Sequence, residues 1–438
     1  MTDVSASPPL VRPAFLKVSA LVFVLTLAFA VRAVWDYVEN RRFDKAVHEI
    51  QLKGEPTQSP ATIPAWDTDE ASRDYRAAGA LASNFHGDAR LPLRTLVASM
   101  QKDEWPEGSV ESLRATLAPY DEAMSLADRA AALSFDEFQA GTYYNYRTSD
   151  FLAVQEICGY RAIFRALNQD ADGAVDSLYT EARQARAMGS WSLWQRLPRP
   201  LIVAQVLERV RPSSAALGRL SKAMSDLDDD RELSRWFEEI RRSKLTTGWR
   251  NVELGAQNSW ETPVLTVLGL RHPAAMHVMN RMVAVLTAIV DASHGPWPAR
   301  IDAVSAIDDP YLWRVPSGQS QESYTKHFAT DIASTAAGFR AVRIVVAVEQ
   351  YRRDHGEQLP PGLGELVPVY FQELPIDPFS GKSLLFKREQ GGYSIYSVGV
   401  NRKDDGGAEV NLPFIGAFPK EHPADIGVRV RYQQRETK

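Results

Sequence analysis

The hydrophobic positions of the chain form one long run near the N-terminus, over residues 14–35. Within AFLKVSALVFVLTLAFAVRAVW only Lys17 and Arg32 carry a charge. As a helix this run would span about 33 Å, enough for a bilayer core of about 30 Å, and the two basic side chains would extend to the two interfaces. The pattern therefore predicts a transmembrane helix over 14–35, preceded by an N-terminal tail over 1–13.

A cleaved signal peptide is an alternative interpretation of the same run. Its uncharged centre, residues 18–31, has the length of a signal-peptide hydrophobic region, and the Ala-Phe-Ala of residues 28–30 fits the small-residue cleavage pattern. Against cleavage, the helical pattern continues without a break to Gly54, whereas cleavage sites usually lie in extended chain. We therefore favour an uncleaved anchor, followed by a juxtamembrane helix and linker over 36–69.

From residue 70 to residue 330 the pattern is mainly helical, with apolar residues at three- and four-residue spacing. Residues 149–188 predict two helices joined near residues 168–173. This pair resembles the helical hairpins of tetratricopeptide-type proteins, although the chain shows no convincing 34-residue period. We expect a large all-α domain of helical hairpins over 70–330.

The character of the sequence changes after residue 330. A strong helix is predicted over 331–356, followed by a series of turns. A β-hairpin is predicted over 383–399, and residues 425–432 alternate as a half-buried strand with a solvated, basic face. The expected fold class is therefore α+β: an N-terminal transmembrane helix, the helical-hairpin domain and a small antiparallel sheet module over 331–438.

Composition narrows the function classes. The 438 residues are 45% hydrophobic and 24% charged, which is ordinary for a globular protein. The net charge of −5, from 50 basic and 55 acidic residues, gives no reason to expect nucleic-acid binding, which usually needs a concentrated basic face. Cys158 is the only cysteine, so an internal disulfide and a cysteine-based zinc site are both excluded.

The C-terminal region follows a family pattern. The matching order is a helix ending in EQYRRDHG, the segment LPPGLGELVPVYFQELPIDPFSGK, a hairpin ending in YSIYSVG, a loop with acidic residues, and a final DI. Over residues 335–432 this order resembles the C-terminal part of the major pseudopilins of type II secretion systems. The resemblance is carried by Tyr351, Gly356, Leu366, Val367, Pro368, Leu374, Pro375, Asp377, Pro378, Phe379, Gly381, Tyr396, Ser397 and Gly399.

Two departures limit what this resemblance implies. A pseudopilin begins with a short leader, a glycine before a phenylalanine, and a glutamate five residues into the membrane helix. Around Phe15 neither that glycine nor that glutamate is present, and a long helical region separates the membrane helix from the module. The chain is therefore not expected to be an ordinary fibre subunit. Its whole layout also looks like a group of uncharacterised membrane-anchored bacterial envelope proteins.

The loop VNRKDDGG, which follows the predicted hairpin, is the candidate metal site. The pseudopilin resemblance implies a calcium ion bound by four side chains: Asn401, Asp404, Asp405 and Asp425. Asn401 stands where an aspartate is usual, which keeps an oxygen but removes a charge, and residues 402–424 separate it from Asp425. The alternative is that these side chains bond to nearby backbone amides and complete a turn.

No other pattern predicts a catalytic site. HExxH, GxSxG, GxxxxGK[ST] and GxGxxG are absent from the sequence. Residues 323–326 fit SxxK without its helper motifs, while His272 and His277 would point roughly 140° apart on a helix and so cannot share one metal ion. Trp191 and Trp194 are expected to pack in the helical core, with an aromatic ligand platform as the alternative.

These patterns predict a membrane-anchored, extracytoplasmic scaffold or adaptor of a bacterial envelope, attached to a secretion or pilus-type assembly and binding a protein partner. The expected location is the bacterial inner membrane, single-pass, with the bulk of the chain in the periplasm. The positive-inside rule alone favours the reverse orientation, because basic residues are more numerous after the run than before it, but large domains can be translocated whatever their flanking charge. An envelope enzyme, or a small-ligand binding protein with a site between the helical hairpins, is the alternative.

Overall fold

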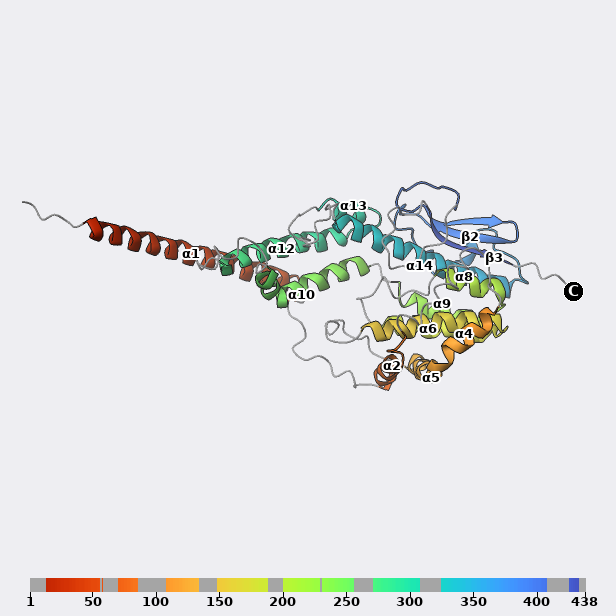
Figure 1. The fold of residues 1–438 in the computed structure, drawn as a ribbon. Helices are drawn as coiled ribbons and strands as arrows, with labels where there is room; N and C mark the ends of the chain where they lie inside the picture. Colours follow the sequence, from red (N-terminus) through yellow and green to blue (C-terminus); the bar gives the residue numbers. More distant parts are fainter. Residues whose placement is uncertain are drawn as a thin grey trace, which may run out of the picture. The chain divides into compact units, whose positions relative to one another are not determined.

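The computed structural model describes residues 13–55, 57, 70–85, 108–133, 148–187, 200–228, 231–255, 271–307, 324–407 and 425–432. These residues are mostly helical, with an apolar N-terminal helix and a three-stranded antiparallel sheet (Figure 1). Residue contacts divide the chain into two compact units. The first comprises residues 1–59, 237–288 and 309–318, and the second comprises residues 60–236, 289–308 and 319–438.

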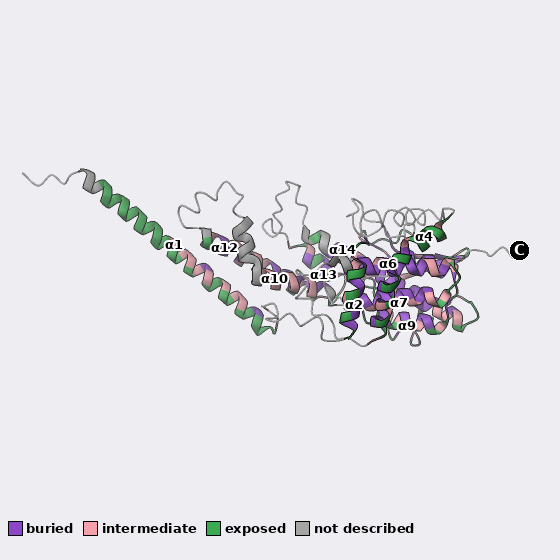
Figure 2. Cartoon of the chain, turned by 60° about the horizontal axis from the view of Figure 1, so that its bottom comes forward, coloured by how far each residue is buried: buried purple, intermediate pink, exposed green. Residues whose placement is uncertain are grey.

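Helix α1 (Pro13–Leu52) belongs to the first unit and changes character along its length. Every side chain from Lys17 to Val31 is exposed, and the large apolar ones are exposed on all faces of the helix, as with Phe23 at 68% and Phe29 at 66% (Figure 2). This part of α1 shows no polar face and no packed face. Its surface is that of a segment suited to an apolar surrounding.

The C-terminal half of α1 packs against α10 (Glu232–Gly255) and α12 (Arg271–Ser293). A buried apolar cluster joins the three helices and consists of Ile50, Leu245, Met279 and Val283. On α1 the further contacts come from Phe43, Ala46 and Val47. Their three- and four-residue spacing puts them on one face of the helix. The predicted juxtamembrane helix is thus a direct continuation of the apolar run.

The end of α1 is fixed to both of its neighbours. Gly54 has a φ of 75°, a conformation that favours glycine, and the backbone N–H of Glu55 donates to the carbonyl of Ile50 to close the last turn. The side chain of Glu55 forms an ion pair with Arg241 of α10, which is 1% exposed. Arg241 also donates to Thr287 Oγ1 of α12 at 3.4 Å.

The second unit begins with helices α2 (Glu70–Leu81), α4 (Ser109–Leu117), α5 (Asp121–Ala132), α6 (Thr148–Leu167), α7 (Ala171–Ala187), α8 (Pro200–Arg209) and α9 (Ser214–Ser225). α6 and α7 are the two helices predicted over 149–188, and they pack side by side. At the turn between them Gln169 adopts a φ of 62°. Asp128 of α5 accepts hydrogen bonds from Arg161 of α6 at 2.6 Å and from Thr180 of α7 at 2.7 Å, so one carboxylate ties three helices together.

The remaining elements of this unit are α13 (Ala299–Ser305), α14 (Tyr324–Asp354), β1 (Leu385–Glu389), β2 (Gly392–Ser397) and β3 (Ile426–Arg431). The strands pair antiparallel in the order β1-β2-β3, as the predicted hairpin and final strand require. Tyr393 lies opposite Val430 and Ile395 opposite Val428, and all four side chains are fully buried. β2 and β3 lie against α14 (Figure 1).

The predicted boundary at residue 331 does not coincide with a break in the core. α14 begins at Tyr324, and a single buried cluster extends from the hairpin helices through α14 to the sheet. The physical reason is that residues 341–348 are apolar except for Arg343, so this part of α14 must be buried on nearly every side. α14 as a whole accordingly contacts α8, α9 and α13 as well as the strands. Independent folding of residues 331–438, and the pseudopilin-like assignment, stay predictions.

The strand predicted over 425–432 is less solvated than expected. Arg431 is exposed, but Arg429 lies partly buried beneath its neighbours. It donates to Glu389 of β1 at 3.1 Å and to the carbonyl oxygen of Gly407 at 2.6 Å. The basic face is therefore partly covered by β1 and by the loop at Gly407, which a single-strand pattern cannot show.

Glu349 connects α14 to the sheet and is 0% exposed. Its Oε1 accepts hydrogen bonds from the hydroxyl groups of Tyr393 at 2.9 Å and Tyr432 at 2.7 Å, while Oε2 accepts from Arg352 at 2.7 Å. The Arg352 guanidinium lies over the Tyr432 ring, 3.9 Å from its centroid. Burial raises the pKa of Tyr393 well above its ordinary value, so its hydroxyl remains a donor.

Glu349→Ala is expected to destabilise the second unit by about 3 kcal/mol or more, because removing one partner of a buried ion pair leaves the other buried and unpaired. The free energy of unfolding from chemical denaturation measures this loss. Glu373→Ala, at an exposed position, is the matched control, with an expected change within about 0.5 kcal/mol. Equal losses in the two variants would contradict the role given to Glu349.

Candidate functional site

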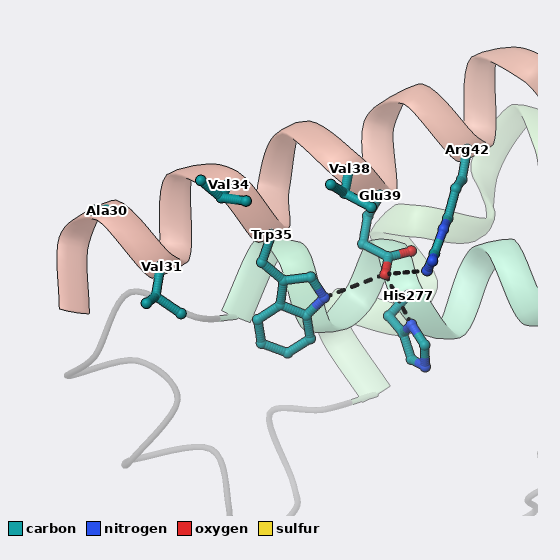
Figure 3. A pocket seen from close by; sticks show the side chains of 8 residues that line it. All are labelled: Ala30, Val31, Val34, Trp35, Val38, Glu39, Arg42 and His277. Carbon is teal, nitrogen blue, oxygen red and sulfur yellow. Dashed lines mark hydrogen bonds and ion pairs between the residues drawn. The ribbon is translucent and has the colours of Figure 1, made fainter. Parts of the chain in front are cut away.

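An open groove of about 590 Å³ lies where α1 changes from exposed to packed (Figure 3). Its apolar wall consists of Ala30, Val31, Val34 and Val38 of α1. Its polar end consists of Trp35, Glu39 and Arg42 of α1 and His277 of α12. All of these residues belong to the first unit. The groove is the candidate functional site because charged side chains converge here beside the exposed apolar half of α1.

Glu39 is the centre of the polar end and is only 2% exposed. Its Oε1 accepts hydrogen bonds from Trp35 Nε1 at 3.3 Å and from Arg42 Nη1 at 3.1 Å, and it lies 3.0 Å from His277 Nδ1. Asn280 Nδ2 donates to Oε2 at 2.8 Å and also to the backbone carbonyl of Glu39 at 2.8 Å. One carboxylate therefore joins α1 to α12.

The surroundings of Glu39 favour its ionised form. Burial alone would raise the pKa of Glu39, but hydrogen bonds from Asn280 and His277, with the charge of His277, outweigh burial and hold the pKa below its ordinary value of 4.5. Glu39 is therefore a carboxylate at neutral pH. Its negative charge orients the side chains of Arg42 and His277, which are 61% and 53% exposed.

Sequence reasoning did not find this cluster. The spacing of His272 and His277 argued against a shared metal ion, and each lies beside a different carboxylate of α1: His272 Nδ1 is 2.7 Å from Asp36 Oδ1, and His277 is beside Glu39. The partners lie on helices far apart in the chain, so no local spacing connects them. The only sequence signal is the presence of Asp36 and Glu39, three residues apart, directly after the apolar run.

The structure brings the four predicted metal-site residues into one loop region. Asp425 reaches the loop despite the long interval before it, and its side chain is fully buried there. Its Oδ2 accepts the backbone N–H of Gly407 at 2.7 Å, and its Oδ1 accepts that of Asp405 at 3.4 Å. Burial is the main cause that raises the pKa of Asp425 above its ordinary value, against these two hydrogen bonds.

The other loop side chains also bond locally. Asn401 Nδ2 donates to Asp405 Oδ2 at 2.7 Å, and Asp404 Oδ1 accepts the backbone N–H of Gly406 at 2.9 Å and the Tyr396 hydroxyl at 3.2 Å. Asn401 Oδ1 also accepts the backbone N–H of Lys403 at 2.9 Å, and this bond, together with the one from the backbone N–H of Gly406 to Asp404, is of the kind that the turn interpretation requires. Among the residues that the structure describes, no group of three or more His, Cys, Asp or Glu side chains is arranged to hold a metal ion. Calcium also uses amide and backbone carbonyl oxygens, so the calcium site stays a prediction.

The other sequence candidates are only partly covered. Ser323, Trp191 and Trp194 lie outside the described residues, and Lys326 is an exposed residue of α14. A further open pocket of about 670 Å³ lies at the C-terminal end of α14. Its charged side chains already have partners: Arg352 pairs with Glu357 and Glu389 with Arg429, both at 2.9 Å, and Arg388 donates to the backbone carbonyl of Pro360 at 2.6 Å.

Comparison of the chain with protein-family models, with curated proteins and with solved structures found no match. Function is therefore argued from the residues and their geometry. Two helices of the described residues are long and apolar enough to cross a membrane, over Lys17–Leu52 and His272–Ser293. The first has no buried residue in its most apolar window, whereas 44% of that window is buried in the second, which is typical of a core helix. The N-terminal apolar helix could thus anchor the chain in a membrane.

The lowered pKa of Glu39 predicts a pH-dependent contact between α1 and α12. A carboxyl group with a lower pKa in the folded chain stabilises the fold above its unfolded pKa, near 4.5, and this contribution is lost as the pH falls through the folded value. The melting temperature of the full chain should therefore fall more steeply below pH 4.5 than that of Glu39→Gln. Glu49→Gln, at an exposed position of α1, should follow the wild type. Parallel curves for wild type and Glu39→Gln would refute this prediction.

Asp425→Ala separates the two interpretations of the acidic loop. It removes the acceptor for two backbone N–H groups and is expected to cost about 1–3 kcal/mol without calcium, measured as a lower unfolding midpoint. If calcium binds, millimolar calcium should stabilise the wild type and not Asp425→Ala or Asp404→Ala. Equal midpoints of the wild type with and without calcium would rule out the calcium site and leave only the turn.

Proposed function

We propose that the chain is a single-pass, membrane-anchored, extracytoplasmic scaffold or adaptor of a bacterial envelope that binds a protein partner. The observation that carries this proposal is the division of α1. Its first half is apolar and exposed on all faces, and its second half is built into a bundle with α10 and α12. A helix divided in this way serves as an anchor that is rigidly attached to a folded body.

The apolar half of α1 is energetically unsuited to water. Ten large apolar side chains from Val18 to Val34 are more than half exposed: Val18, Leu21, Val22, Phe23, Val24, Leu25, Leu27, Phe29, Val31 and Val34. Fully burying a side chain of this kind is worth about 1.5–3 kcal/mol. Together they provide a strong drive toward lipid. The paired and buried charges of the second half lie beyond this stretch, as an interface position requires.

The bacterial inner membrane, the periplasmic orientation and attachment to a secretion or pilus-type assembly are parts of the same proposal. They are supported by the resemblance of residues 335–432 to pseudopilins. The protein-binding role is supported by the stacked helical pairs of the second unit, an arrangement that presents extended surfaces in other helical-hairpin proteins. Crosslinking in membranes followed by identification of the captured proteins tests this role directly.

One observation favours small-ligand binding as a second candidate. Gln155 of α6 is 3% exposed, and neither of its side-chain amide atoms has a hydrogen-bond partner within the part of the chain that the structure describes. The side-chain oxygen of Gln184 of α7 is likewise without one among those residues. An unsatisfied buried polar group costs about 1–3 kcal/mol, so a water molecule or a small polar ligand between the helical pairs would relieve this cost.

The membrane anchor is tested by fractionation. The intact chain is expected to sediment with membranes and to resist carbonate extraction, because the exposed apolar turns of α1 enter the bilayer. A chain that begins at Asp36 keeps the packed half of α1 and is expected to be soluble and folded. Recovery of a mature protein beginning at Val31 or Val34 would instead show a cleaved signal peptide.

The orientation is read from the same samples by thiol labelling. Burial raises the pKa of the Cys158 thiol to about 12, so the native cysteine should not react at neutral pH. Lys382→Cys places a thiol at an exposed position of the second unit. A membrane-impermeant maleimide should label it in cells with an opened outer membrane before the inner membrane is broken. Labelling only after lysis would place the second unit in the cytoplasm.

A further inference from the structure

The groove on α1 has two chemically different ends. Its apolar wall continues the exposed half of the helix, and its polar end holds Glu39 with the basic side chains of Arg42 and His277 (Figure 3). From Ala30 to Arg42 the helix rises about 18 Å, at about 1.5 Å per residue. This length and this polarity match the headgroup and upper chain of a lipid lying alongside the helix.

Arg42 and His277 each keep hydrogen-bond donors that are not used in the contact with Glu39. Arg42 uses Nη1 for the carboxylate, and no other hydrogen bond of its guanidinium is found among the described residues, while its side chain is 61% exposed. The free part of the guanidinium presents N–H groups in a planar fork, the geometry that suits a phosphate. His277 is held through Nδ1, so in its imidazolium form it offers Nε2–H beside the same space.

The position of the groove decides what can occupy it. Val31 and Val34, at 56% and 63% exposure, belong to the apolar stretch that enters the bilayer if the proposed anchoring holds. Trp35 stands at the end of this stretch, where indole rings are enriched at membrane interfaces. The apolar wall then faces acyl chains, and Arg42 stands at the level of the lipid phosphates.

We propose that this groove binds one glycerophospholipid of the surrounding membrane, with its phosphodiester at Arg42 and His277 and an acyl chain along Val31, Val34 and Val38. This inference rests on the proposed membrane anchoring. Glu39 is a positioning residue: it holds the two basic side chains on the lipid side of α1 and does not contact the lipid itself. The bound lipid would fill the groove between α1 and α12 within the first unit.

Native mass spectrometry of the full chain, released from detergent micelles supplemented with phosphatidylglycerol, tests the proposal. The wild type is expected to retain one lipid. Arg42→Gln should lower the retained fraction about tenfold through loss of the charge-assisted bonds to phosphate, and Val34→Gln should lower it through loss of the apolar wall. Arg41→Gln is the matched control, since Arg41 is exposed on α1 and contacts Tyr37 instead of the groove, and it should retain lipid as the wild type does.

The outcomes distinguish failure of the lipid site from failure of the proposed membrane anchoring. Carbonate extraction of the same variants tests the anchor, and wild-type protein in the soluble fraction would overturn the anchor and the lipid site together. If all variants stay in membranes but retain equal amounts of lipid, the anchor stands and the lipid site is wrong. Lipid retention that millimolar inorganic phosphate abolishes, with no effect of Val34→Gln, would show an anion site and also overturn the proposal. Thermal melts of each variant verify that the first unit remains folded.

Discussion

The first unit depends on the buried carboxylate of Glu39. Four side chains, two on α1 and two on α12, donate to it or lie within hydrogen-bond distance of it. The side-chain amide of Asn280 donates both to its Oε2 and to the backbone carbonyl of Glu39. An ionised group with 2% exposure is stable only because these partners replace water. Since apolar turns precede Glu39 and packed turns follow it, this residue marks the position along α1 at which one kind of environment ends and the other begins.

In the second unit, too, carboxylate side chains join elements that are far apart in the chain. Buried or half-buried carboxylates hold the helices and the sheet in register: Asp128 between α5, α6 and α7, Glu349 between α14 and the strands, and Asp228, which binds Arg340 and Arg343 of α14. Apolar contacts, which fill the core between these carboxylates, are not directional. The ionic contacts join specific residues across these elements, and loss of one partner of a buried pair would leave the other charge buried and unpaired.

The spacing of apolar, polar and turn residues within short segments correctly predicted the elements that depend on local interactions. The apolar run, the α6–α7 pair and the hairpin of β1 and β2 each depend on spacing within a short segment, and the structure contains all three. The long-range ion pairs were not predictable in this way. Nothing near Asp228 marks Arg340, which follows it by 112 residues, as its partner. The extent of α14 was missed because its first turns, before residue 331, lack the dense apolar spacing of its centre.

The acidic loop shows an intermediate case. The resemblance grouped Asp425 with Asn401, Asp404 and Asp405, and the structure does place Asp425 against the loop. Sequence could not determine how the side chains bond, because backbone N–H groups and a cation compete for the same carboxylate oxygens. In the structure both oxygens of Asp425 accept backbone N–H groups, and a calcium ion would have to share or replace these bonds.

The continuity of α1 constrains how its two halves can move relative to each other. From Ala14 to Lys53 the sequence contains no glycine and no proline, so the helix has none of the usual points at which it bends sharply. Its apolar half and its packed half must therefore tilt or rotate together. Because Glu55 and Arg241 fix the far end of the helix, such a movement would act on α10 and α12 directly. A ligand in the groove at Glu39 would lie on this rigid connection, so its binding energy would bear on the orientation of the whole first unit.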